Sequence, residues 1–298
     1  MHADMWEAGS LDEVLDGGDS PQAKLEHILH CKSPFHAHVD KAAEFIRSNR
    51  GLIDSPRHNF AILDPLIENI ESRIFFAREA DELAFSVKHD RDSLKLLNDA
   101  YCSWETALEQ IFAKRLCSGS ASSLHDYRLN KRFQRLLQRE TSLLRGKNPR
   151  RALFIGSGPF PISAIWLHRN LGIPVDGLDV SLDAVERSRE LIDKLGLSGS
   201  IGIIHEDSRS YNVSEYDVII VALLAKPKQL ILENIHSSAK DSCEIICRTS
   251  FGLRSVIYEP TLVTHEILER FSIEDARIVT GSTDDTISSL LLKKLPAA

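Results

Sequence analysis

The segment from residue 151 to residue 179 constrains the fold of this 298-residue chain most strongly. It reads RALFIGSGPFPISAIWLHRNLGIPVDGLD, which is an apolar run, a glycine turn, a helical stretch and a second apolar run ending in Asp179. This order predicts a βαβ unit with parallel strands. Gly156 and Gly158 let the backbone turn sharply and approach a ligand, and an acid about 20 residues further on can accept both hydroxyls of a ribose. The segment therefore predicts a nucleoside-binding unit.

The glycine pattern differs from that of dinucleotide-binding proteins. A third glycine belongs at position 161, where Pro161 stands, and Pro159 lies two residues earlier. Because a pyrophosphate cradle needs the flexible backbone of the full glycine motif, a nucleoside without phosphates is the better ligand. We expect S-adenosylmethionine. The alternative is an ordinary glycine-rich turn in an α/β domain.

Composition limits the classes of protein to which the chain can belong. Apolar residues make up 43% and charged residues 27%, with a formal net charge of -7, which is typical of a globular protein and argues against a nucleic-acid partner. The sequence contains no run of 18 apolar residues, so we expect no membrane span. The acidic N-terminus is unlike a signal peptide, and we expect a cytoplasmic protein whose residues 1–20 form a flexible arm.

Cysteine and histidine spacing does not predict a metal site. Cys243 and Cys247 fall in an apolar stretch that resembles a buried strand, without a CxxC pair. His36 and His38 would share a face in an extended segment, but further ligands at useful spacing are missing. We interpret them as surface histidines near a turn, and we expect no metal.

The two halves of the chain differ in periodicity. Residues 21–147 repeat apolar positions at spacings of three and four, with breaks near residues 55, 91 and 119, which predicts a helical domain. Residues 148–298 alternate short apolar runs with helical stretches, which predicts a doubly wound, mainly parallel sheet. The predicted strands are ALFI, VDGLDV, SIGIIHED, YDVIIVALL, CEIICRTS and ISSLLLKK, with helices at 161–171, 182–195, 227–239 and 260–270.

Ligands of such sheets bind outside the carboxyl ends of the strands. Asp207 ends the third strand, where it can accept the adenine amine, or else cap the turn that follows. An apolar tetrapeptide, residues 222–225, follows the fourth strand where a methyltransferase would carry a polar motif. The predicted cofactor-binding residues are Gly156, Ser157, Gly158, Pro159, Asp179, Val180, Asp207, Ala222 and Leu223.

With these residues in view, the chain resembles the nicotianamine synthase family, including bacterial members that make opine-type metallophores such as staphylopine and pseudopaline. The matching stretches are FIGSGPFP at 154–161, YDVIIVALLA at 216–225, and RTSFGLR at 248–254 with Tyr258. The resemblance covers residues 100–292. It implies an α/β, Rossmann-like S-adenosylmethionine-dependent transferase domain preceded by an N-terminal helical bundle that covers the acceptor site.

The resemblance also implies the reaction and its residues. The family moves the 3-amino-3-carboxypropyl (aminobutyrate) group of S-adenosylmethionine to an amine and releases 5′-methylthioadenosine. Glu109 is the candidate base that takes the proton of the amine, with Tyr127 as a second catalytic residue. An exposed ladder of Glu105 and Glu109 with Lys114 or Arg115 is the alternative. The candidate substrate-binding residues are Glu105, Arg248, Arg254 and Tyr258. Salt bridges to Glu259 or Asp217 would also explain the two arginines.

The acceptor is expected to be an amino acid. Similarity to the bacterial members favours one transfer to histidine, with glutamate as the other candidate, and a downstream opine dehydrogenase would use the product. The sequence leaves a homodimer open. Two other functions stay open as well, an S-adenosylmethionine-dependent small-molecule N-methyltransferase and a non-catalytic α/β binding module.

Overall fold

The computed structural model describes residues 20–78, 80–81, 85 and 90–296. The predicted flexible arm, residues 1–20, therefore lies outside the described residues except for Ser20, which caps the first helix by accepting a hydrogen bond from the backbone N–H of Ala23. In the described part of the chain, we find no helix that combines the length and the apolar character needed to span a membrane.

The first half of the chain is helical, as predicted. Two of the predicted breaks, near residues 55 and 119, follow helix ends, and the third lies at Asp90, whose side chain caps the longest helix by accepting hydrogen bonds from two backbone N–H groups. The helices are α1 (Pro21–Leu29), α2 (Phe35–Ser48), α3 (Gly51–Asp54), α4 (Phe60–Phe75), α6 (Arg91–Cys117), the 3-10 helix η1 (Leu124–Asp126) and α7 (Asn130–Ser142).

The second half forms a seven-stranded sheet with the order β3-β2-β1-β4-β5-β7-β6. The first five strands along the chain are parallel, and β7 runs antiparallel between β5 and β6, which confirms the predicted α/β class. The strands are β1 (Ala152–Ile155), β2 (Val175–Asp179), β3 (Ile201–His205), β4 (Val218–Val221), β5 (Glu244–Thr249), β6 (Phe271–Arg277) and β7 (Ser288–Lys294).

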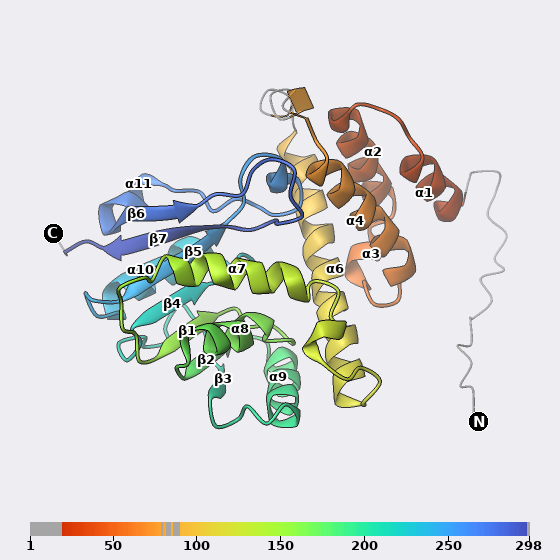
Figure 1. The fold of residues 1–298 in the computed structure, drawn as a ribbon. Helices are drawn as coiled ribbons and strands as arrows, with labels where there is room; N and C mark the ends of the chain where they lie inside the picture. Colours follow the sequence, from red (N-terminus) through yellow and green to blue (C-terminus); the bar gives the residue numbers. More distant parts are fainter. Residues whose placement is uncertain (1–19, 79, 82–84, 86–89, 297–298) are drawn as a thin grey trace.

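Both faces of the sheet are covered (Figure 1). Successive side chains of a strand point to opposite faces, so Phe154 joins the core beneath the helical half, whereas Leu153 and Ile155 join the core on the other side. The first face carries α7, α8 (Ile162–Leu171) and α9 (Leu182–Lys194), and the second carries α10 (Lys228–Ser238) and α11 (His265–Arg270).

Helix α6 joins the helical half to the sheet. It contacts α9 and the 3-10 helix η2 (Gly252–Val256). The side chain of Asn98 donates hydrogen bonds of 2.9 Å and 3.0 Å to the backbone carbonyls of Ser255 and Val256. Because Asn98 is buried, these two bonds fix α6 beside the carboxyl end of β5.

Three expectations about local structure are wrong. Strand β6 was not expected, because an edge strand with the sequence FSIEDAR lacks a continuous apolar run. The helix expected at 260–270 begins only at His265, and residues 259–264 form no regular secondary structure. His38 is 1% exposed and lies on α2 rather than at a surface turn, and burial lowers its pKa to about 4.

Candidate active site

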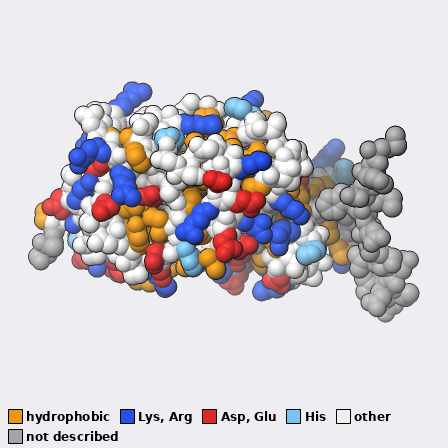
Figure 2. Space-filling model, turned by 90° about the horizontal axis from the view of Figure 1, so that it is seen from below, with side chains coloured by type: hydrophobic (Ala, Val, Ile, Leu, Met, Phe, Trp, Pro, Cys, Tyr) orange, Lys and Arg blue, Asp and Glu red, His pale blue; other side chains and the backbone are white. Residues whose placement is uncertain are grey.

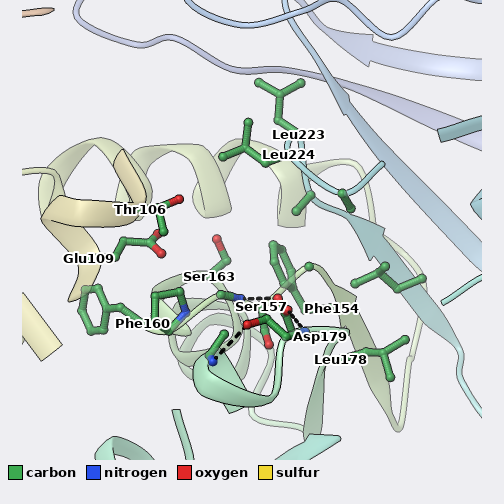
Figure 3. Close-up of a pocket in the computed structure, with 18 of the residues that line it drawn as sticks. Thr106, Glu109, Phe154, Ser157, Phe160, Ser163, Leu178, Asp179, Leu223 and Leu224 are labelled. Atoms are coloured by element: carbon green, nitrogen blue, oxygen red, sulfur yellow. Dashed lines mark hydrogen bonds between the residues drawn. The ribbon is translucent and has the colours of Figure 1, made fainter. Parts of the chain in front are cut away.

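A cavity of about 380 Å³ opens at the carboxyl ends of β1, β2 and β4, beneath α6. Both halves of the chain line it (Figure 3). Most of the predicted site residues are in its wall, namely Glu105, Glu109, Gly156, Ser157, Gly158, Pro159, Asp179, Val180, Ala222, Leu223, Arg248 and Tyr258. Parallel strands bring their carboxyl ends to one edge, so residues far apart in sequence meet here.

The turn after β1 requires both of its glycines. Gly156 has a φ of 81°, and a Cβ there would lie 3.0 Å from the Cβ of Ala225 and 3.1 Å from that of Ala222. Gly158 has a φ of 67°, and a Cβ there would lie 2.9 Å from Oε2 of Glu109. A side chain at either position would combine a left-handed backbone with a steric conflict. The turn is therefore packed against the loop after β4 on one side and against α6 on the other.

Asp179 is oriented by the backbone of that turn. Its Oδ2 accepts a 2.8 Å hydrogen bond from the N–H of Gly158, and its Oδ1 accepts a 2.9 Å bond from the N–H of Ser181. Each carboxylate oxygen has a second lone pair, which stays available to a ligand hydroxyl. Ser181 caps α9 by accepting from the N–H of Ala184, as the sequence predicts.

Two carboxylates project from successive turns of α6. Glu105 is 5% exposed and accepts a 2.8 Å hydrogen bond from the hydroxyl of Tyr258. Burial raises the pKa of Glu105 to about 7. Burial, and next the negative charges of Glu105 and Asp179, raise the pKa of Glu109 well above its ordinary value. An exposed ladder with Lys114 or Arg115 is therefore wrong, because these glutamates face the cavity.

Arg248 lines the cavity as part of a buried ion pair. It donates through Nε and Nη2 to the two carboxylate oxygens of Glu140, at 2.8 Å and 2.9 Å, and through Nη1 to Ser163. Arg248 therefore forms a salt bridge, as one alternative predicted, but its partner is Glu140 of α7 and neither Glu259 nor Asp217. Two guanidinium N–H groups remain beyond these three bonds.

Three predicted residues lie outside the cavity wall. Arg254 donates to the backbone carbonyls of Gly281, Thr283 and Asp285, so it holds the loop that leads into β7. It therefore supports the wall from behind, because Ile287 at the end of that loop lines the cavity.

Asp207 and Tyr127 are the other two predicted residues that lie outside the cavity wall. Asp207 pairs with Arg209 and caps the turn after β3, which is the alternative that the sequence left open, and the Arg209 hydrogen bonds lower the pKa of Asp207 to about 2. Tyr127 is 2% exposed and packs between Phe112 and Phe160, whose ring centroids lie 5.0 Å and 4.8 Å from its own.

Several wall residues were not predicted. Thr106 and Gln110 lie one helical turn apart on α6, adjacent to the predicted glutamates, so helical spacing could have found them. Lys226, Ser163 and Phe160 also line the cavity. Glu140, the partner of Arg248, does not itself line the cavity, and the sequence could not reveal it because the contact joins positions 108 residues apart.

Among the described residues, no three or more His, Cys, Asp or Glu side chains are grouped so that they could hold a metal ion. On the face shown in Figure 2, basic and acidic side chains are intermixed. The absence of a metal from the reaction stays a prediction.

Comparison with known proteins shows the family to which this chain belongs. The model of the nicotianamine synthase protein family matches residues 78–296. The chain belongs to the nicotianamine synthase family. The match includes α6 and α7 of the helical half as well as the sheet, so α6 and the cavity wall that it supplies are part of the shared architecture.

Two relatives illustrate what this chain is similar to in sequence. L-histidine 2-aminobutanoyltransferase from Yersinia pestis is 30% identical over 181 residues, which are 61% of this chain and 64% of that protein. Nicotianamine synthase 1 from Oryza sativa subsp. japonica is 27% identical over 159 residues, or 50% of this chain and 47% of that protein. The matched region thus spans less than two thirds of either relative.

Solved structures of a nicotianamine synthase share the fold over nearly the whole chain. MtNAS in complex with MTA and tNA has a TM-score of 0.77 and 26% identity, covering 89% of this chain and 100% of that one. A mutant of MtNAS in complex with S-adenosylmethionine has a TM-score of 0.73 and 25% identity, with the same coverage.

Proposed function

We propose that this protein transfers the 3-amino-3-carboxypropyl group of S-adenosylmethionine to the amine of an amino acid and releases 5′-methylthioadenosine. The observation that carries the proposal is the position of Glu109, whose Oε2 would lie 2.9 Å from a Cβ on Gly158. A carboxylate with a raised pKa thus lies directly over the turn on which the donor would bind. The solved complexes of MtNAS with S-adenosylmethionine and with MTA support a donor of this class.

The donor would lie along the sheet edge. Asp179 would accept the ribose hydroxyls, while Val180, which is 68% exposed at the cavity, offers an apolar surface to the adenine. The methionine end would then extend past Gly156 toward the loop after β4. All three carbons on the sulfonium are electrophilic, so the one in line with the amine reacts, and the wall selects the γ-carbon by placing the amine near Glu109.

Glu109 would orient the acceptor and take its proton. The amine lone pair attacks the γ-carbon, the bond from that carbon to sulfur breaks, and the electron pair stays on the sulfur of the thioether. Burial raises the pKa of Glu109, which makes its carboxylate a stronger base and suits it to accepting the ammonium proton. The two guanidinium N–H groups that Arg248 keeps could bind the acceptor carboxylate.

Histidine is the acceptor that we propose. The cavity wall carries five acidic side chains, which disfavour an acceptor with a second carboxylate such as glutamate and favour one with a basic ring. They are Glu105, Glu109, Asp179, Asp183 and Glu206. The name of the Yersinia pestis relative supports the same choice. We propose a single transfer, with the product passing to an opine dehydrogenase that completes a metallophore.

Mass spectrometry tests this proposal directly. The protein is incubated with S-adenosylmethionine and, separately, with L-histidine, D-histidine and L-glutamate. We expect histidine to gain one aminobutyrate unit while 5′-methylthioadenosine accumulates. A methyl gain with S-adenosylhomocysteine would instead make the protein a methyltransferase. Binding of S-adenosylmethionine without product from any of the three amino acids would contradict the proposed acceptors.

A further inference from the structure

A side pocket of about 10 Å³ adjoins the main cavity and is lined by residues of α6, of α7 and of the segment that leads into β7. The two spaces share part of their walls, so a group held in the side pocket lies next to the main cavity. The shared residues are Glu105, Phe133, Tyr258 and Ile287, and the rest of the side pocket is lined by Arg132, Leu136, Arg139 and Thr286.

The two arginines of the side pocket each keep one buried N–H group without a partner. Arg132 donates through Nη1 and Nη2 to the carboxylate of Glu71, at 2.6 Å and 3.2 Å. Arg139 donates through Nη1 to the carboxylate of Asp285. The Nε atom of each arginine is buried and has no hydrogen-bond partner in the described part of the chain. The two Nε–H groups are therefore donors that the side pocket can use.

Glu105 is a third group with unused hydrogen-bonding capacity. It is buried, and the hydroxyl of Tyr258 donates to its Oε2. Among the residues that the structure describes, no second donor reaches this carboxylate. Because a buried carboxylate ordinarily accepts several hydrogen bonds, one donor leaves Glu105 incompletely solvated. Two unpaired donors and one underused acceptor thus border the same small space.

The size and chemistry of the side pocket select its occupant. A space of about 10 Å³ is near the minimum that holds one water molecule and is too small for a carboxylate group. A cation would meet two guanidinium groups. A water has two lone pairs for the two Nε–H groups and two hydrogens for oxygen acceptors, which Glu105 and Thr286 carry.

We propose that the side pocket binds one ordered water that accepts hydrogen bonds from Arg132 and Arg139 and donates to Glu105, and that this water fixes Glu105 for binding a basic group of the acceptor. Tyr258 then holds one oxygen of this carboxylate and the water holds the other. The role toward the acceptor rests on the proposed function, whereas the water site does not. Arg139 is a positioning residue, because it acts through the water and Glu105.

A high-resolution crystal structure of the ligand-free protein tests the water site without any variant. We expect one solvent peak within about 3.2 Å of both Nε atoms and of a carboxylate oxygen of Glu105. A side pocket closed by a side chain, or a water bonded to fewer than two of these three groups, would overturn the proposal.

The Arg139→Lys variant tests the effect on the acceptor, with Arg135→Lys as the matched control. Arg135 also lies on α7 and pairs with Asp285, but its Nε donates to that carboxylate at 3.0 Å and it does not line the side pocket. Both substitutions keep the positive charge, so only Arg139→Lys removes a donor from the side pocket.

Steady-state kinetics and donor titration measure the outcome. We expect Arg139→Lys to raise KM for histidine at least about fivefold, while kcat and donor affinity change less than about twofold. Arg135→Lys should leave all three quantities unchanged. Equal effects of the two substitutions, or an unchanged KM in Arg139→Lys, would contradict the role of the water in fixing Glu105.

This inference and the proposed function fail in different ways. If the wild-type protein forms no product with any amino acid, the proposed function fails, and crystal structures still decide the water site. The wild type should hold the water and Arg139→Lys should not, so a water retained in that variant would refute the part given to Arg139. If product forms but the wild-type side pocket holds no water, only this inference fails.

Discussion

Single residues at the centre of the cavity determine how closely the two halves of the chain approach. The contact between Gly158 and Glu109 is one such point, since a Cβ on Gly158 would lie 2.9 Å from Oε2 of Glu109. Gly158→Ala should weaken binding of S-adenosylmethionine by at least about tenfold, because the added methyl group displaces either the turn or the base. Calorimetry measures this change.

The Gly172→Ala variant is the control that separates the steric contact with Glu109 from the cost of placing a side chain at a positive φ. Gly172 has a φ of 68°, similar to that of Gly158, but a Cβ there meets nothing within 4 Å. Its substitution should cost stability through the backbone alone and leave donor affinity nearly unchanged. If both alanine variants lose affinity alike, the proximity of Glu109 is not the cause.

Glu109 itself can be tested by removing its charge. Glu109→Gln keeps the shape of the side chain but cannot accept a proton, so we expect turnover to fall at least about a hundredfold while donor affinity changes little. Steady-state kinetics and donor titration measure the two quantities. Glu109→Asp, which keeps a carboxylate on a shorter side chain, should recover part of the activity. Full activity of Glu109→Gln would remove this residue from the mechanism.

At the scale of helices and strands, features encoded in one continuous segment could be predicted, whereas contacts between distant elements could not. The glycine turn and Asp179 could be predicted because one continuous βαβ unit encodes both. The strands that are buried on both faces are continuous apolar runs and were recognised, whereas β6 lies at the sheet edge and carries charged residues. The pairing of Arg248 with Glu140 could not be predicted, because it depends on how α7 packs over β5.

The buried ion pair between α7 and β5 yields a prediction at this scale. Glu140→Gln leaves the charge of Arg248 buried without a counterion, which should lower the free energy of unfolding by about 3 kcal/mol. The double variant Glu140→Leu, Arg248→Met should lose less, because it buries no charge at all. Chemical denaturation of both variants measures the difference. A double variant that is less stable than Glu140→Gln would show that the pair itself, rather than its separation, determines stability.

At the scale of the whole molecule, the burial of Glu105 should make the free energy of unfolding depend on pH. The pKa of Glu105 is about 7 in the folded protein and near 4.5 when unfolded, so the folded state binds more protons between these values. Its contribution therefore lowers the free energy of unfolding as the pH rises from about 4.5 to about 7, by at most about 3 kcal/mol. Glu105→Gln cannot ionise and should gain stability relative to the wild type across this range.

Denaturation series at several pH values measure this effect. The difference in the free energy of unfolding between Glu105→Gln and the wild type should grow up to neutral pH and then level off. Glu68→Gln serves as a control, since Glu68 pairs with Arg128 on the surface. A difference for Glu105→Gln that is independent of pH would mean that this carboxyl titrates at its ordinary pKa in the folded protein.

Under the proposed function, the donor side and the acceptor side of the cavity come from separate segments of the chain. The loops proposed to bind the donor follow β1, β2 and β4, whereas the carboxylates proposed to face the amine lie on α6. A change on one turn of α6 can therefore alter the choice of amine without disturbing the groups that hold the donor. Such an arrangement lets related enzymes diversify: one half of the binding site is inherited unchanged while the other is free to acquire a new substrate.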